Sequence, residues 1–109
     1  MDLHPADLDD AIARAARAAN RARALPHWWV AFGVETLGRW YVVILGPPPH
    51  HRVAAIYRIR PDLRLKRIVR PPRNLPRLAR NKVGTTPVRQ VEHPGDREGW
   101  TMTAARFDG

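Results

Sequence analysis

The spacing of apolar residues changes near His27, and this change constrains the fold more than any other feature. Residues 5–25 carry apolar side chains three and four positions apart, the period of an α-helix with one buried stripe. From residue 28 the spacing is close to two and β-branched and aromatic residues dominate, which is typical of strands. The chain therefore predicts an α+β fold, in which an N-terminal amphipathic helix packs on a sheet.

The predicted helix over residues 5–25 carries signals for its start and its end. Pro5 suits the first helical position, acidic residues follow in the first turns, and basic residues occupy the later turns. Asp10 and Arg14 are spaced to form an ion pair. The apolar stripe consists of Leu8, Ile12, Ala15, Ala19 and Ala22. Because this stripe is mostly alanine, the helix can lie close against a sheet or against its own copy in a homodimer, before Leu25 and Pro26 end it.

Four strands are predicted between residues 28 and 70, joined by short connections. They are Trp28–Glu35, Arg39–Leu45, Arg52–Arg60 and Leu63–Arg70. Gly38 can supply a positive φ in the first connection, and Pro61 with Asp62 suits a type I turn in the last. Short connections between consecutive strands predict a mostly antiparallel, meander-like sheet.

The rest of the chain predicts a short second helix and a C-terminal extension. Residues 74–82 form a basic helix with Asn74 as its N-cap. Residues 84–109 form either a second hairpin, from strands 87–92 and 99–107, or a mobile tail. With this hairpin the sheet has four to six strands, and a length of 109 residues favours a single small domain over residues 1–109.

Positive charge is concentrated in one third of the chain. Between Arg52 and Arg89 lie twelve of the nineteen basic residues and one acid, Asp62. The remaining residues hold seven Lys or Arg against nine Asp or Glu. Coding bias toward GC-rich codons accounts for the use of Arg rather than Lys, but not for this clustering. A polyanion relieves the self-repulsion of such a segment, so we expect a nucleic acid, DNA or RNA, as the partner.

Strand alternation sorts these charges onto faces. If the third and fourth strands pair as predicted, one face is open to solvent and the other carries the core. The solvent face then holds five basic side chains: Arg58, Arg60, Arg64, Lys66 and Arg70. The predicted phosphate-binding residues are these five and their neighbours in the loops and the second helix: Arg52, Arg58, Arg60, Arg64, Lys66, Arg70, Arg73, Arg77, Arg80 and Lys82. Arg is suited to the task because its guanidinium binds phosphate through two parallel hydrogen bonds.

Two other interpretations of the same residues remain open. The charged face can be the solvated outside of a sheet, since charged edge strands prevent aggregation. It can also dock an acidic protein, with the alanine-rich helix or an exposed tryptophan as the apolar anchor. Trp28 and Trp29 point to opposite faces, so one of them is a candidate for exposure, base stacking or self-association. Tyr57, and one of Trp40 and Tyr41, belong to the core.

Several function classes are disfavoured by what the chain lacks. It contains no Cys and no Ser, which removes thiol and serine nucleophiles, disulfides and Cys-containing zinc sites. His50 and His51 point apart in an extended segment, so we expect no metal site, and no glycine-rich loop predicts a nucleotide cofactor. The longest apolar run, residues 40–46, is too short for a bilayer span, and without a signal peptide we expect a cytoplasmic protein.

In size, basicity and helix-then-sheet order, the chain resembles small basic ribonuclease toxins of the RelE/ParE type. This resemblance of architecture implies metal-independent RNA cleavage as the enzymatic alternative, with His50 or His51 moving protons beside the arginines. The residues themselves favour a small, non-enzymatic protein that binds the phosphate backbone through an arginine-rich hairpin and the helix that follows it.

Overall fold

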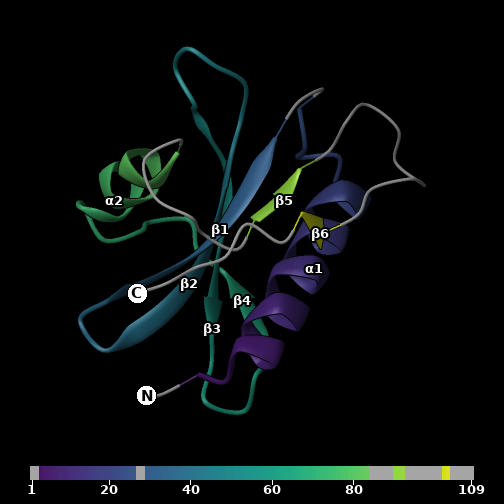
Figure 1. Cartoon of the computed structure of the whole chain (residues 1–109), viewed down its shortest axis with the longest axis vertical. Coiled ribbons are helices and arrows are strands. Elements are labelled where there is room, and N and C mark those ends of the chain that lie inside the picture. Colours follow the sequence, from purple (N-terminus) through teal and green to yellow (C-terminus); the bar gives the residue numbers. More distant parts are fainter. Residues whose placement is uncertain (1–2, 27–28, 84–89, 93–101, 104–109) are drawn as a thin grey trace.

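A single antiparallel sheet carries one helix on each of its two faces (Figure 1). The computed structural model describes residues 3–26, 29–83, 90–92 and 102–103. The elements are α1 (Pro5–Arg21), β1 (Val30–Thr36), β2 (Arg39–Leu45), β3 (Val53–Ile59), β4 (Leu65–Arg67), α2 (Leu75–Lys82), β5 (Gln90–Glu92) and β6 (Met102–Thr103). The strand order is β4-β3-β2-β1-β5-β6. The predicted α+β fold, with its N-terminal helix, antiparallel meander and short second helix, is confirmed.

Helix α1 begins as predicted and ends four residues early. Pro5 occupies the first turn, and the Nδ1 atom of His4 accepts a hydrogen bond from the Ala6 N–H at 3.1 Å. At the other end Arg23 has a φ of 55°, and the Ala24 N–H bonds to the Ala19 carbonyl at 2.9 Å. This left-handed turn satisfies the last carbonyls and stops the helix before Leu25 is reached.

The alanine-rich stripe of α1 packs on the sheet. Its buried residues are Leu8, Ala11, Ile12, Ala15, Ala16 and Ala19. Ala22 follows the helix and is exposed, so its predicted place in the stripe is wrong. The approach is close at Gly33 of β1, where an added Cβ would lie 2.5 Å from Leu8 Cδ1. Because the stripe is buried in this way, it is not a free surface for self-association.

Both faces of the central strands β1 and β2 are buried, which corrects the expectation of one core face and one solvent face for this part of the sheet. On the side of α1, the core contains Trp29, Val42, Ile44, Ala55, Tyr57 and Ile59. On the side of α2, it contains Val30, Phe32, Val34, Tyr41, Val43, Leu45 and Ile56, with Leu75 and Ala79 of the helix. A strand buried on both faces reads as a continuous apolar run, which explains why β2 does not alternate between apolar and polar residues.

The hairpins β1–β2 and β3–β4 have turns at the predicted positions. Thr36 pairs with Arg39, and the two residues between them, Leu37 and Gly38, have φ values of 54° and 74°. Leu63 donates its N–H to the Arg60 carbonyl at 2.8 Å, the bond expected for the turn at 60–63. Strand β4 is shorter than the predicted strand over residues 63–70 because the turn extends through Leu63, whose φ is 69°.

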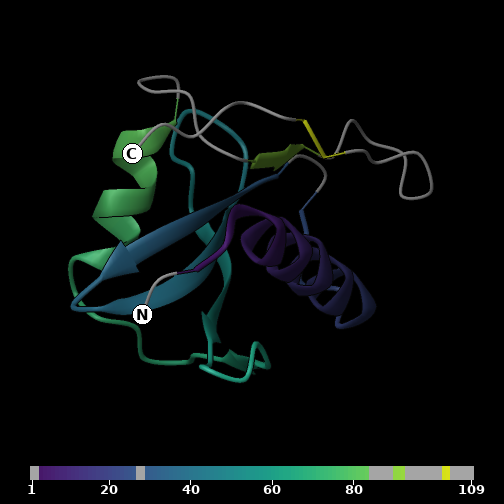
Figure 2. The same cartoon turned by 60° about the horizontal axis from the view of Figure 1, so that its bottom comes forward.

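After β4 the chain crosses to the start of α2 (Figure 2). The Ile68 N–H bonds to the Ile56 carbonyl at 2.9 Å, and the chain then leaves the strand. Asn74 stands at the N-cap position of α2, but its side chain makes no capping bond, contrary to the prediction. Its Nδ2 atom lies 3.4 Å from the Thr36 Oγ1 atom, so it joins the helix to the end of β1.

Near the C-terminus, two short strands extend the sheet beyond β1. Strand β5 pairs antiparallel with β1 and with β6. Both strands lie inside the segments 87–92 and 99–107 that were predicted as a hairpin; most of the remaining extension, residues 84–109, falls outside the described residues. Within the described part of the chain, neither helix has the length and apolar character that crossing a bilayer requires.

Candidate nucleic-acid interface

The central pair of the candidate interface is Arg58 on β3 and Lys66 on β4. These two residues lie directly opposite each other across the β3–β4 ladder. Residue Ile56, two positions before Arg58, belongs to the core under α2, so alternation places the Arg58 and Lys66 side chains on that same face. Two like charges at directly paired positions destabilise a sheet unless an anion lies between them.

Arg58 is also unusual in its burial. Its side chain is half-buried, and its Nε atom is buried with no hydrogen-bond partner among the described residues. An unpaired donor in such a position costs about 1–3 kcal/mol. This Nε atom is closed to solvent. An incoming oxygen anion therefore meets the two paired cations from outside and does not contact the buried Nε atom.

Two more cations, Arg60 and Arg64, lie on the same face, closer to the turn between β3 and β4. The Arg60 N–H bonds to the Arg64 carbonyl at 2.9 Å, so these two residues also face each other. Arg39 begins β2 two residues before Tyr41, and Tyr41 pairs with Arg58. The last pair of this ladder is Trp40 with Ile59, and extending the register by one residue places Arg39 beside Arg60. We call Arg39, Arg58, Arg60, Arg64 and Lys66 the hairpin cluster.

Arg39 was not among the predicted site residues. The signal was present in the sequence, because the alternation of the strand over residues 39–45 puts Arg39 on the same face as Tyr41. It was missed because β2 reads as an unbroken apolar run after its first residue. Only the strand register shows that this first residue lies next to the cations of the neighbouring hairpin.

Helix α2 adds cations on the same side of the sheet. Leu75 and Ala79 are buried against the sheet, so Arg77 and Arg80 project outward and are exposed. The Arg80 Nε atom donates to the His51 carbonyl at 3.1 Å, which ties the helix to the loop before β3. Arg73 is exposed immediately before the helix. Because His51 directly precedes Arg52, Arg80 lies near the end of β3 that is far from the hairpin cluster. The Lys82 side chain is outside the described residues.

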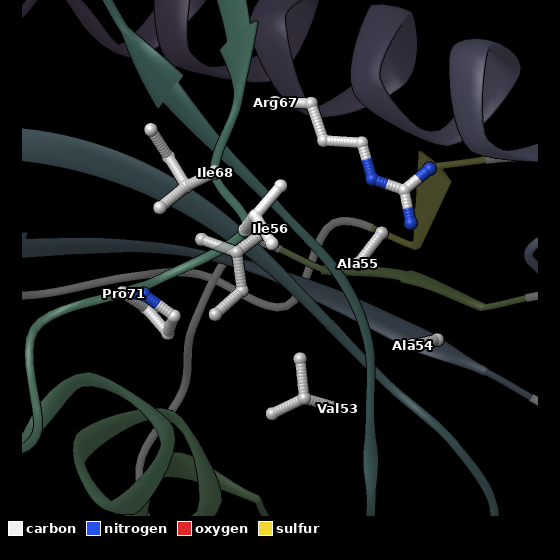
Figure 3. A pocket seen from close by; sticks show the side chains of 8 residues that line it. Val53, Ala54, Ala55, Ile56, Arg67, Ile68 and Pro71 are labelled. Carbon is white, nitrogen blue, oxygen red and sulfur yellow. The ribbon is translucent and has the colours of Figure 1, made fainter.

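Two of the predicted site residues lie away from the hairpin cluster. Arg52 is exposed at the beginning of β3, six residues before Arg58, which corresponds to about 20 Å along a strand. Arg70 is exposed on the chain between β4 and α2. Arg67, opposite Tyr57, falls on the face of α1. In Figure 3, the Arg67 guanidinium extends away from Ile68 and Ile56, which point to the other side.

Few of these charges are neutralised locally. Asp62, the one acid between Arg52 and Arg89, lies with its Oδ2 atom 3.7 Å from the Arg64 Nε atom. Both side chains are more than half exposed, so this pair contributes little. The other basic side chains of the segment have no acid of the same segment to pair with.

The aromatic side chains within the described residues belong to the core rather than to the surface. Trp29, Tyr41 and Tyr57 are buried, as the core interpretation predicted for at least three of the five aromatic residues. Trp40 is half-buried against the core under α1. Trp28, the other half of the predicted pair, lies outside the described residues.

His50 and His51, the two histidines considered for proton transfer, lie away from the hairpin cluster. His50 is exposed, and the His51 Nδ1 atom lies 3.0 Å from the Gly46 carbonyl oxygen. Both residues precede Arg52, at the end of β3 that is far from the cluster. Among the described residues, no group of three or more His, Asp or Glu side chains is placed to hold a metal ion.

No model of a known protein family matches the chain, no curated protein matches its sequence, and no solved structure matches its fold.

Proposed function

We propose that the protein binds nucleic acid through the phosphate backbone, using the hairpin cluster and the outer side of α2, without catalysing a reaction. The observation that carries this proposal is the Arg58–Lys66 pair: two cations directly opposite each other across the β3–β4 ladder. A phosphate oxygen between them replaces repulsion by two charge-assisted hydrogen bonds, the strong class of hydrogen bond.

The neighbouring residues extend this pair into a surface of useful size. Arg39, Arg60 and Arg64 continue it along the sheet, and Arg73 and Arg77 continue it toward α2. Separate phosphates of one backbone can occupy such a series of cations at the same time. Each contact releases counterions, so the affinity falls steeply with salt, by about 0.9 log units per phosphate contact and per log unit of salt.

Backbone contact is favoured over base stacking. Proteins that bind single strands through their bases present aromatic side chains on the surface. In the described part of this chain, Trp29, Phe32, Tyr41 and Tyr57 are buried and Trp40 is half-buried. The described surface therefore offers charge without a stacking platform, which favours binding with little dependence on sequence.

The test is fluorescence anisotropy of labelled nucleic acid over a salt series. We expect the Arg60→Glu/Arg64→Glu variant to lower the affinity and to reduce the slope of log K against log salt by at least about 1.8, since two contacts are removed. Arg52→Glu is the control. It makes the same change at another exposed arginine, but Arg52 lies at the other end of β3. The control should retain most of the wild-type slope.

An unchanged slope in the Arg60→Glu/Arg64→Glu variant would show that the hairpin cluster does not bind phosphate. The same samples test the alternative of a ribonuclease, because labelled RNA incubated with the protein in EDTA should be recovered at full length. Shortened RNA that becomes intact again in a His50→Ala/His51→Ala variant would replace binding by cleavage as the activity.

A further inference from the structure

Strand β4 forms an edge of the sheet and carries cations on both of its faces. It lies at the end of the strand order, and among the described strands only β3 pairs with it. Lys66 points to the side of α2, where it faces Arg58. Arg67, the next residue, lies opposite the buried Tyr57 and so points to the side of α1 (Figure 3).

On the α1 side, a hollow of about 400 Å³ continues this cationic edge. It lies between the helix and β4 and is lined by Arg14, Arg17, Ala18, Arg21 and Leu65. Arg17 and Arg21 are exposed, stand four residues apart on the same side of the helix, and form no ion pair with a described residue. They were predicted to lie near the negative end of the helix dipole. Arg21 does lie in the last turn of α1, and both residues also line the hollow beside the sheet edge.

Arg14 holds this arrangement together. Its Nε atom pairs with Asp10 at 2.8 Å, as predicted, and its Nη2 atom donates to the Leu63 carbonyl oxygen at 2.8 Å. Leu63 belongs to the turn between β3 and β4, so the bond fixes the hairpin to α1. Arg14 is thus a positioning residue, while Arg17 and Arg21 remain available to an anion.

We propose that the β4 edge enters the major groove of duplex DNA, with the hairpin cluster facing the phosphates of one strand and Arg17, Arg21 and Arg67 facing those of the other. This inference rests on the proposed function and names its ligand. A groove of a duplex has one row of phosphates along each of its two sides. This arrangement matches the β4 edge, which carries cations on both of its faces. A single strand has one row, and the described aromatic residues that could stack its bases are buried or half-buried.

The dimensions of the groove select DNA over RNA. The major groove of B-form DNA is about 12 Å wide and admits a two-stranded β-ribbon. The major groove of A-form RNA is too narrow and deep for protein side chains to read. The hairpin β3–β4 at the edge of the sheet is such a ribbon, and α2 packs mainly on β1 and β2, away from it.

The first test measures binding of the Arg17→Gln/Arg21→Gln variant to duplex DNA, duplex RNA and single-stranded DNA over a salt series. Gln keeps a high helix propensity, so α1 should remain folded. For duplex DNA we expect the salt slope to fall by about 1.8, corresponding to two lost phosphate contacts. For single-stranded DNA and duplex RNA, which bind through the hairpin cluster alone, the slope should stay unchanged.

The results separate this inference from the proposed function. If Arg17→Gln/Arg21→Gln leaves the duplex DNA slope unchanged while Arg60→Glu/Arg64→Glu reduces it, phosphate binding stands and the groove assignment fails. If neither variant changes the slope, both fail. An equal loss for all three nucleic acids would also overturn the groove assignment, because it would place α1 on a surface that any strand can reach.

A second measurement reports the groove directly. Guanine N7 lies in the major groove, so a bound β4 edge should protect it from methylation. We expect protection with the wild-type protein and less protection with the Arg17→Gln/Arg21→Gln variant at equal occupancy. Full methylation of guanine N7 in a saturated complex would contradict insertion into the major groove.

Discussion

At the scale of single residues, Arg58 is a position where the proposed binding surface opposes stability. Its Nε atom is buried without a partner among the described residues, and it faces Lys66 across the ladder. Both features raise the free energy of the folded protein when no anion is bound. A residue kept only for packing would have an apolar side chain of the same length at this position.

This interpretation of Arg58 predicts opposite effects on stability and on binding. Arg58→Met keeps the length of the side chain and removes its charge, so we expect the free energy of unfolding to rise by about 1 kcal/mol and the affinity for nucleic acid to fall. Chemical denaturation and anisotropy on the same sample measure the two quantities. Arg58→Lys is the control, because it keeps the charge and the repulsion from Lys66. Loss of stability in Arg58→Met would mean that the guanidinium has a structural role.

At the scale of elements, the ends of helices and hairpins depend on residues with positive φ. Arg23 ends α1 in this way, and Leu37 with Gly38 closes the hairpin β1–β2. Glycine adopts this conformation freely, but Leu37 does so at a cost of about 1–2 kcal/mol. The Leu37 side chain is 86% exposed and so gains little from packing.

The hairpin β1–β2 should therefore be stabilised by Leu37→Asn. Asn tolerates the left-handed region, and Asn-Gly is the favoured pair for a two-residue hairpin turn of this kind. We expect the free energy of unfolding to increase by about 1 kcal/mol, which urea denaturation measures. Leu37→Ala serves as the control, since it removes the exposed side chain but leaves the unfavourable φ; an equal gain in both variants would assign the effect to the side chain.

At the scale of the whole molecule, the net charge of +9 opposes folding. The hairpin cluster and α2 occupy one side of the sheet, and Arg17, Arg21 and Arg67 the other. The positive charges on the two faces of the β4 edge repel each other across the sheet. Local pairs such as Arg14–Asp10 and Arg64–Asp62 reduce only a part of this repulsion.

Thermal stability should therefore rise with ionic strength in the absence of nucleic acid. Between 10 mM and 150 mM NaCl the Debye length falls from about 30 Å to about 8 Å, which screens repulsion across the molecule. We expect an increase in Tm of a few degrees, since about 1 kcal/mol corresponds to roughly 4–8 °C in a domain of about this size. A smaller increase in Arg60→Gln/Arg64→Gln would assign the effect to the hairpin cluster, whereas a falling Tm would show that attractive pairs dominate.

The sequence alone determined the elements and most of their order. Pro5 and the apolar period located α1, the change of period at His27 located the sheet, and Gly38 and Pro61–Asp62 located two turns. These features are local, because helix period, strand alternation and turn preference depend on residues a few positions apart. The grouping of Arg58, Arg60, Arg64 and Lys66 followed from alternation for the same reason.

The tertiary structure decided which faces are buried and which cations meet. Strand alternation cannot show that α1 and α2 cover opposite faces of the sheet. On the side of α2, the β3–β4 hairpin therefore contributes Ile56 to a second core, and its cations lie at the end of that core. The position of Arg39 beside Arg60 and the placement of Arg17 and Arg21 beside β4 both depend on contacts between distant segments. Packing between elements is set by the whole chain, and no short window of sequence contains it.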